Sequence, residues 1–187
     1  MDEAKFKIDS IDENFIILAN EQTKGRGRRG DKWISPFGNI YCSIALFVNL
    51  SNKDLFKFGI LTSVAVKRSL EHIGLIDICF KWPNDIYCDD KKISGVIQES
   101  YLNKLEKNYL ITGVGINFLS SPKNSNYQTT HITEYVKNIS REQYFEIFIN
   151  YFLNYFNNFL LNKNDDFIFE YKKTQMLLNT NIKIKLD

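Results

Sequence analysis

The sequence predicts an α+β fold, with a central mixed, largely antiparallel sheet flanked by helices. Short segments rich in β-branched and aromatic residues are typical of strands, and they alternate along the 187 residues with longer segments of helical periodicity. Residues 86–88 and 93–101 have the pattern of two hairpin arms, which pair in antiparallel fashion. Strands with interspersed helices and antiparallel pairs favour the α+β class.

The elements expected in the first part of the chain alternate between helix and strand. Leu55, Phe58 and Val66 keep helical spacing and predict the long helix of this part. In chain order we expect a helix over 2–8, strands over 14–21 and 39–48, a helix over 53–72 with Ser51 or Asn52 as its N-cap, and a strand over 76–82.

The second part is expected to begin with a turn and to end in helices. Ser140 and Gln143 form the pattern of a capping box, ahead of a segment that is apolar over more than half its circumference. Such a helix is expected to be buried against the sheet. In chain order we expect a turn at 83–85, a hairpin with the polar tip 89–92, a strand over 109–119, a loop over 120–126, helices over 140–161 and 164–177, and a strand-like segment at 181–186.

Composition and charge exclude several classes of protein. The formal net charge is only +2 and the basic residues are spread along the chain, which argues against a bulk polyanion ligand. No segment approaches about 18 consecutive apolar residues, so we expect no membrane span. Residues 1–5 lack the apolar core of a signal peptide. Cys42, Cys79 and Cys88 are odd in number and lack metal-ligand spacing, which favours reduced thiols in the cytoplasm.

The most informative segment is the basic glycine loop, Gly25-Arg26-Gly27-Arg28-Arg29-Gly30. Its glycines leave the backbone without side-chain bulk, and its arginines supply planar, charged forks that suit carboxylate and phosphate oxygens. The spacing matches G-x-G-x-x-G, but Pro36 and Gly38 interrupt the helix that a dinucleotide-binding turn would open. Asp31 and Lys32 do not fit a P-loop or a kinase glycine loop. We therefore interpret the segment as a loop that wraps an anion.

Three further segments follow the basic glycine loop. Lys81-Trp82-Pro83-Asn84-Asp85 places a cation, an indole and two short polar side chains at a strand end. Lys92-Ile93-Ser94-Gly95 places a lysine ahead of a strand that contains a glycine. Gly113-Val114-Gly115-Ile116-Asn117-Phe118 carries two glycines, which mark a close approach to the backbone. Each has an ordinary structural explanation, such as a turn, an exposed end or a bulge, but together and in this order they indicate one site.

With the basic glycine loop first, this set resembles biotin protein ligases from about residue 21 to residue 117. The resemblance implies the class II synthetase-like biotin/lipoate ligase fold and an enzyme that forms a C–N bond. In the first step ATP activates biotin to biotinyl-5′-AMP and pyrophosphate is released. In the second step a specific lysine of a biotin carboxyl carrier domain attacks the mixed anhydride and AMP is released.

The resemblance also implies roles for individual residues. Lys92 matches the catalytic lysine that bridges carboxylate and α-phosphate oxygens, and Arg28 matches the arginine at that junction; preorganised donors of this kind contribute about 3–4 kcal/mol each. We expect biotin to contact Gln22, Arg26, Gly27, Arg28, Lys92, Gly95 and Gly115. We expect ATP and the adenylate to contact Arg28, Arg29, Trp33, Asn84, Lys92 and Asn117, with Trp33 stacked on adenine.

Substrates and partners follow from the same resemblance. Biotin is expected as substrate and ATP with Mg²⁺ as co-substrate, without a permanently bound cofactor. Asp85 is expected either to help bind Mg²⁺ or to order the Lys81–Asn84 turn, and the sequence leaves both roles open. The expected partner is the carrier domain of a biotin-dependent carboxylase. No helix-turn-helix precedes the matched region, so we expect no DNA binding, and a homodimer is an option by analogy alone.

The family pattern sets the expected domain boundaries. Residues 1–178 are expected to form the catalytic domain, and 179–187 the remnant first strand of a small C-terminal β-barrel domain. The family carries a Ser-Thr-Asn segment that helps to hold biotin, and Ser10-Ile11-Asp12 is the nearest match found here. Part of the biotin pocket is therefore expected to fall outside this sequence.

Three other interpretations compete with biotin ligation. They are a lipoate ligase or octanoyl transferase of similar fold, a catalytically impaired biotin- or adenylate-binding module, and an RNA-binding domain that uses the loop arginines. The basic glycine loop and the Lys81–Asp85 turn favour biotin, and Lys92 argues against an impaired module. RNA binding would require aromatic residues exposed for stacking, whereas most of them here fall in a helix that is expected to be buried.

Overall fold

The computed structural model describes residues 1–11, 13–47, 52–123, 127–161 and 166–176. Within them a six-stranded sheet has the order β1-β2-β6-β5-β4-β3, and all of its pairs are antiparallel. The strands are β1 (Phe15–Ala19), β2 (Ile40–Phe47), β3 (Ile78–Lys81), β4 (Asp85–Cys88), β5 (Lys91–Leu102) and β6 (Asn108–Ile116). The predicted α+β class with a largely antiparallel central sheet is confirmed. Parallel contacts within the described ranges are isolated bridges from Phe80 to Gln175 and from Lys92 to Thr129.

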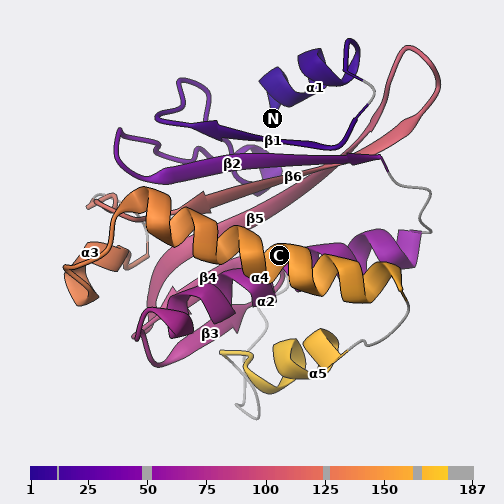
Figure 1. Cartoon of the computed structure of the whole chain (residues 1–187). Coiled ribbons are helices and arrows are strands. Elements are labelled where there is room, and N and C mark those ends of the chain that lie inside the picture. The colour runs from indigo at the N-terminus through magenta and orange to yellow at the C-terminus, as the bar shows by residue number, and fades with distance from the viewer. Residues whose placement is uncertain (12, 48–51, 124–126, 162–165, 177–187) are drawn as a thin grey trace, which may run out of the picture.

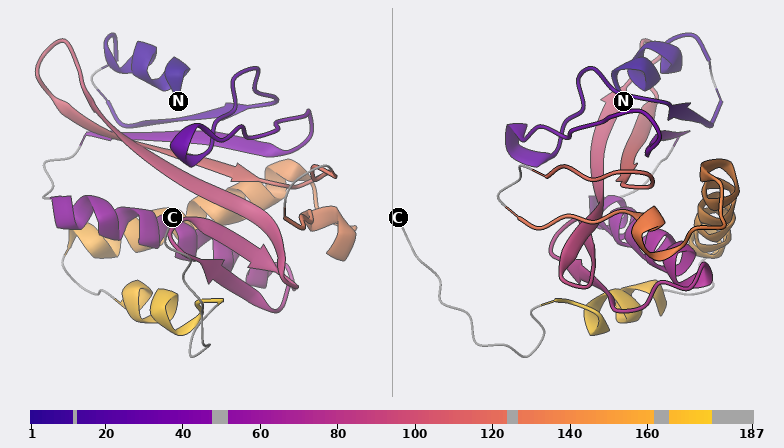
Figure 2. Two further views of the ribbon diagram at one scale, coloured as in Figure 1. Left: turned by 180° about the vertical axis from the view of Figure 1, so that it is seen from behind. Right: turned by 90° about the vertical axis from the view of Figure 1, so that its left-hand side faces the viewer.

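Two long helices cover one face of the sheet, and a short helix packs on the opposite face (Figures 1 and 2). The described helices are α1 (Asp2–Ile8), α2 (Asn52–His72), α3 (Ile132–Tyr135), α4 (Arg141–Leu160) and α5 (Asp166–Lys173), with a 3₁₀ turn η1 at Arg28–Gly30. α2 packs against both α4 and α5, whereas α1 packs against β2 and β6. None of the described helices has both the length and the apolar character that crossing a bilayer requires.

The main core lies between the sheet and the pair α2 and α4, and aromatic rings dominate it. Phe58 of α2 meets Phe152 and Phe156 of α4 with ring centroids 5.8 and 5.5 Å apart. Phe148 meets Phe152 at 6.3 Å, and all four side chains are buried. Tilted and edge-on ring contacts stabilise the core beyond the area that they bury. The helix predicted over 140–161 is therefore buried as expected.

Alternation along the central strands gives the two faces of the sheet different roles. On β6, Val114 and Ile116 belong to the main core, whereas Ile111 belongs to a small cluster under α1. Gly113 and Gly115 share the face of Ile111, because successive side chains in a strand point to opposite faces. Beyond α1 this face therefore presents bare backbone instead of apolar side chains.

The hairpin predicted around 89–92 has a shorter tip than expected. Only Asp89 and Asp90 form the turn, with φ of 49° and 59°, as a two-residue turn of type I′ requires. Lys92 was expected in the tip and instead lies within β5, and Asp85 was expected in the preceding turn and instead begins β4. Polar residues at the ends of both strands hide the strand period, which is why the sequence alone placed these boundaries wrongly.

The other expected elements are present within the described residues, and the ends that can be compared differ by a few residues. The expected ends at 48, 124–126, 164–165 and 177 lie outside the described residues. The predicted capping box is confirmed: the Gln143 backbone N–H donates to Ser140 Oγ at 3.1 Å, and the Ser140 N–H donates to Gln143 Oε1 at 2.9 Å. Asn52 is already part of α2, and the alternative cap Ser51 lies outside the described residues. The segment 181–186 and the boundary at 179–187 also lie outside them. The single-turn helix α3 was not predicted.

Replacing Phe152 with alanine is expected to destabilise the protein by about 3–5 kcal/mol, because a cavity would open among packed rings. Leu153→Ala is the matched control, since Leu153 is the next residue of α4 and is 42% exposed. Its loss is expected to change the free energy of unfolding by less than about 1 kcal/mol. Urea-induced unfolding measures both values, and equal losses would contradict the assigned packing.

Candidate active site

The floor of the candidate site is made by glycines of two adjacent strands. Gly95 of β5 pairs directly with Gly115 of β6, and Gly113 pairs with Ile97. A Cβ atom on Gly115 would lie only 2.6–2.8 Å from atoms of the Trp33 indole, and one on Gly95 would lie 3.1 Å from the same ring. The glycines therefore permit a flat group to lie directly on the backbone of the sheet.

Trp33 occupies part of this glycine-floored hollow. Its Nε1 is buried, and it finds no hydrogen-bond acceptor in the part of the chain that the structure describes. A buried indole N–H without an acceptor is a donor that an oxygen of a ligand can satisfy. The resemblance assigns Trp33 to adenine, whereas the ring here lies on Gly95 and Gly115, which the resemblance assigns to biotin.

The basic glycine loop folds back on itself beside the hollow. The Trp33 N–H donates to the Gly25 carbonyl at 3.0 Å, and the Gly27 N–H donates to the Asp31 carbonyl at 2.7 Å. Gly30 ends the turn η1 with a φ of 86°, a conformation that favours glycine. The loop is thus a narrow hairpin whose tip carries Arg28 and Arg29.

Lys92 is held in the cavity by an ion pair and two aromatic rings. Its Nζ lies 2.7 Å from Asp85 Oδ2, 5.2 Å from the centre of the Trp33 ring and 5.0 Å from that of Tyr127. Lys92 is only 9% exposed, so its charge is weakly screened and acts strongly on an anion that enters the cavity. Asp85 therefore contacts Lys92 directly, a role that neither alternative for Asp85 included.

Arg28 and Asn84 face each other from the basic glycine loop and the Trp82–Asn84 turn. Arg28 Nη1 lies 3.5 Å from Asn84 Oδ1, a long contact, and it is the one hydrogen bond of this guanidinium within the described ranges. Gln22 Oε1 accepts a hydrogen bond from Ser35 Oγ at 2.8 Å. The Arg26 guanidinium is different, because carboxylates already bind it.

The cavity collects most of the residues that the sequence singled out. Those that line it are Gln22, Arg26, Gly27, Arg28, Trp33, Asn84, Asp85, Lys92, Gly95 and Gly115. Asn117 is not among its lining residues, and the side chain of Arg29 lies outside the described part of the structure. Arg29 lies in η1, and the buried Asn117 donates from Nδ2 to the Thr130 carbonyl at 3.0 Å, which braces the chain after β6.

Several lining residues were missed by the sequence analysis. Tyr127 reaches Lys92 from the segment after β6, and no local pattern marks it. Lys24 and Ser43 were missed as well, although Lys24 adjoins the basic glycine loop. Cys42 also lines the cavity, but burial raises the pKa of its thiol to about 12, so the thiol stays protonated at neutral pH and is not an activated nucleophile.

Comparison with known proteins agrees with this geometry. Residues 1–117 match the model of the Biotin/lipoate A/B protein ligase family. The chain belongs to this family. The matched region contains the first three motifs and the fourth as far as Asn117. Together with the relatives described below, it confirms the resemblance to the catalytic domain of biotin protein ligases.

Curated relatives in the family share about a third of their residues with this chain over the matched region. The bifunctional ligase/repressor BirA of Escherichia coli is 30% identical over 112 residues, which are 59% of this chain and 35% of BirA. The human biotin–protein ligase is 36% identical over 113 residues, 57% of this chain and 15% of that protein. The chain therefore spans about a third of the length of BirA and less of the human protein.

Solved structures of family members share the fold. A biotin protein ligase from Aquifex aeolicus in complex with biotin and ATP has a TM-score of 0.78 and 29% identity, and covers 93% of this chain and 75% of its own. The Leishmania major ligase in complex with biotinyl-5-AMP has a TM-score of 0.79, covers 100% of this chain and 82% of its own, and is 23% identical. At 23% identity, the similarity to the Leishmania major ligase shows the fold alone.

Asp85→Asn is expected to lower the free energy of unfolding by about 1–3 kcal/mol, because it leaves the cation of Lys92 without its counter-charge in a partly buried site. Asp90→Asn is the control, since Asp90 is exposed and asparagine tolerates its positive φ. Urea titrations of both variants measure the difference. An Asp85→Asn protein as stable as Asp90→Asn would show that the ion pair contributes nothing.

Proposed function

We propose that this chain is a biotin protein ligase, which activates biotin with ATP and transfers it to a lysine of a biotin carboxyl carrier domain. The observation that carries the proposal is that Lys92, Arg28 and the glycine-floored hollow meet in one cavity. The hollow suits a flat, largely apolar ring system that can lie on bare backbone. The cations suit a carboxylate and a phosphate that must approach each other.

In the first step an oxygen of the biotin carboxylate attacks the α-phosphorus of ATP. The bond from that phosphorus to the bridging oxygen breaks, and pyrophosphate leaves with the electron pair. Two anions have to meet, so the barrier includes their mutual repulsion, which Lys92 and Arg28 offset. Lys92 exchanges its ion pair with Asp85 for the oxygens of the substrate. Mg²⁺ would accompany ATP as co-substrate, and Asp85, once Lys92 has left it, would be the carboxylate available either to this ion or to the Lys81–Asn84 turn.

In the second step the amine of the acceptor lysine attacks the carbonyl carbon of the adenylate. The carbon–oxygen bond to the phosphate breaks, AMP leaves, and the attacking nitrogen loses a proton. Arg28, at the mouth of the cavity, stabilises the negative charge of the departing phosphate. Gln22, Gly95 and Gly115 are assigned to biotin, and Asn84 to the nucleotide. The Trp33 ring lies on these two glycines in the structure and has to move aside for biotin to reach them.

Family membership and the relatives support this assignment. The Aquifex aeolicus ligase, whose structure contains biotin and ATP, is 29% identical to this chain. Relatives named as biotin ligases are 30–36% identical to this chain over more than half of its length.

Exchange of labelled pyrophosphate into ATP is expected to depend on added biotin. Lys92→Ala and Arg28→Ala are each expected to slow the exchange by about 10²–10³-fold, because each removes one preorganised charge from the transition state. Lys104→Ala is the control, since Lys104 lies in the turn after β5 with its side chain 80% exposed, and it should leave the rate unchanged.

Two outcomes would contradict the proposal. Exchange that depends on lipoate or octanoate, and not on biotin, would assign the chain to the lipoate branch of the same fold. A folded protein without exchange for any of these acids would have either an incomplete pocket or an inactive one. Adding a Ser-Thr-Asn segment ahead of Met1 then separates an incomplete pocket from an inactive one, because only an incomplete pocket would regain exchange.

A further inference from the structure

Four charged side chains form a closed cluster beside the cavity. Arg26 donates from Nε and Nη2 to Glu99 Oε1 and Oε2, each at 3.0 Å, so the pair is bidentate. Arg26 Nη1 donates to Asp2 Oδ1 at 2.7 Å, and Lys5 Nζ lies 2.6 Å from Glu99 Oε2. The cluster joins three parts of the fold, namely α1, the basic glycine loop and β5. We call it the Arg26 clamp.

The Arg26 clamp is electrically balanced. It contains two cations and two carboxylates, and the Arg26 guanidinium uses all three of its nitrogen atoms in hydrogen bonds to carboxylates. Burial raises the pKa of Glu99, but hydrogen bonds from Lys5 and Arg26 outweigh it and leave this pKa below its usual range. The hydrogen bond from Arg26 likewise lowers the pKa of Asp2. Both carboxylates are therefore ionised at neutral pH.

Arg28 stands in a different situation, although it lies only two residues away. Among the described residues, its guanidinium makes a single hydrogen bond, a long one to Asn84. Arg28 also borders both the cavity and the groove beside α2. An arginine that is already saturated by carboxylates has little left to offer an anionic substrate, whereas one without a carboxylate partner can bind it. The two arginines of the loop therefore differ in role: Arg26 pairs with carboxylates of the protein, and Arg28 remains available to an anionic substrate.

We propose that Glu99 is a positioning residue, which holds Arg26 in the clamp and thereby fixes the basic glycine loop so that Arg28 is the arginine presented to substrate. The backbone also supports a fixed loop, because Arg26 and Lys32 form an isolated antiparallel β-bridge at the base of the loop. Fixing the side chain at one end of so short a hairpin limits where its tip can lie. The kinetic part rests on the function proposed above, but the structural part does not.

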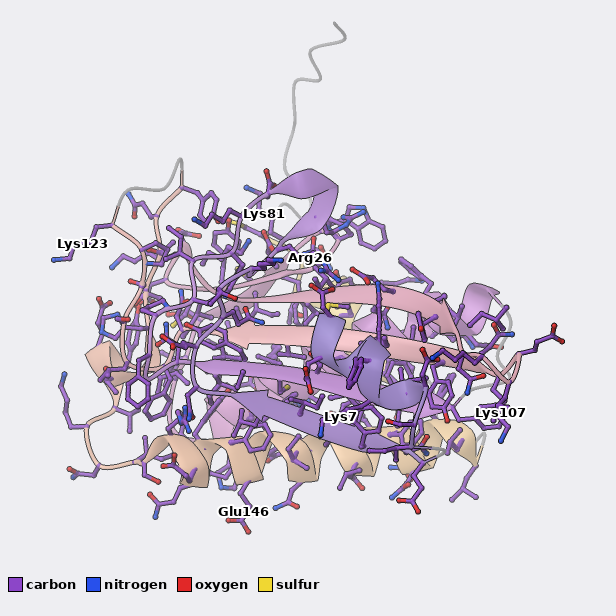
Figure 3. All side chains as sticks on the ribbon, turned by 90° about the horizontal axis from the view of Figure 1, so that it is seen from above. Lys7, Arg26, Lys81, Lys107, Lys123 and Glu146 are labelled. Carbon is purple, nitrogen blue, oxygen red and sulfur yellow. The ribbon has the colours of Figure 1, made fainter. Side chains whose placement is uncertain are left out.

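The test compares Glu99→Gln, Arg26→Gln and the double variant, with Glu146→Gln as control. Glu146 is exposed on α4, on the other side of the molecule from Arg26 (Figure 3). Limited trypsin digestion followed by mass spectrometry measures cleavage after Arg26, Arg28 and Arg29. Far-ultraviolet circular dichroism confirms that each variant is folded. Pyrophosphate exchange then gives kcat and the KM for biotin and ATP.

The expected result is that cleavage in the loop accelerates by roughly ten- to a hundredfold in Glu99→Gln and Arg26→Gln, as the loss of charge-assisted hydrogen bonds implies. The double variant is expected to match the single ones in cleavage and in KM, since both residues act through one pair. Arg28→Gln should lower kcat without accelerating cleavage elsewhere in the loop. Glu146→Gln should change nothing.

The opposite pattern would overturn the proposal. If Arg26→Gln raises the KM for biotin strongly while Glu99→Gln leaves both KM and cleavage unchanged, Arg26 binds substrate directly and Glu99 positions nothing. If the wild-type protein shows no exchange, the function proposed above fails, but the cleavage rates still test whether Glu99 orders the loop.

Discussion

The direct pairing of Gly95 with Gly115 across β5 and β6 is the constraint on which the site depends. It removes side chains from the open face where Trp33, three residues after the basic glycine loop, lies on the sheet. Trp33 can therefore approach the backbone, and Lys92, three residues before Gly95, enters the same hollow. The opposite face of the sheet packs on the aromatic core with α2 and α4. The core therefore stabilises the strands whose other face carries glycines instead of side chains.

Two of the cations that line the cavity, Arg26 and Lys92, are already balanced by protein carboxylates. Asp85 balances Lys92, and Asp2 with Glu99 balances Arg26 and Lys5. Unpaired charges packed this closely would repel each other and destabilise the fold. The balance is local, however, and an anion can replace one carboxylate at a time. This arrangement suits a site that has to bind two anions, because the protein carboxylates keep the cations from destabilising the fold before the anions bind.

Secondary structure and fold class could be predicted from the sequence wherever apolar residues recur with the period of a helix or a strand. The apolar helix over 140–161, its capping box at Ser140 and Gln143, and the strand dense in β-branched residues over 39–48 all formed as expected. Prediction failed where polar residues end a strand: Asp85 and Lys92 were placed in turns, although both belong to strands. Tyr127 could not be predicted, because only the path of the chain after β6 brings it to Lys92.

The sequence by itself determined the family, the fold class and ten of the residues that line the cavity, because glycines, arginines and lysines at fixed spacing are local features. Only the tertiary structure decided which of those residues pair with other protein side chains and which remain available to a ligand. Arg26 and Arg28 are arginines of the same short loop, yet one faces Glu99 and Asp2 and the other faces Asn84. The physical reason is that ion pairs between α1, the loop and β5 depend on distances in space, which the spacing of residues along the chain does not encode.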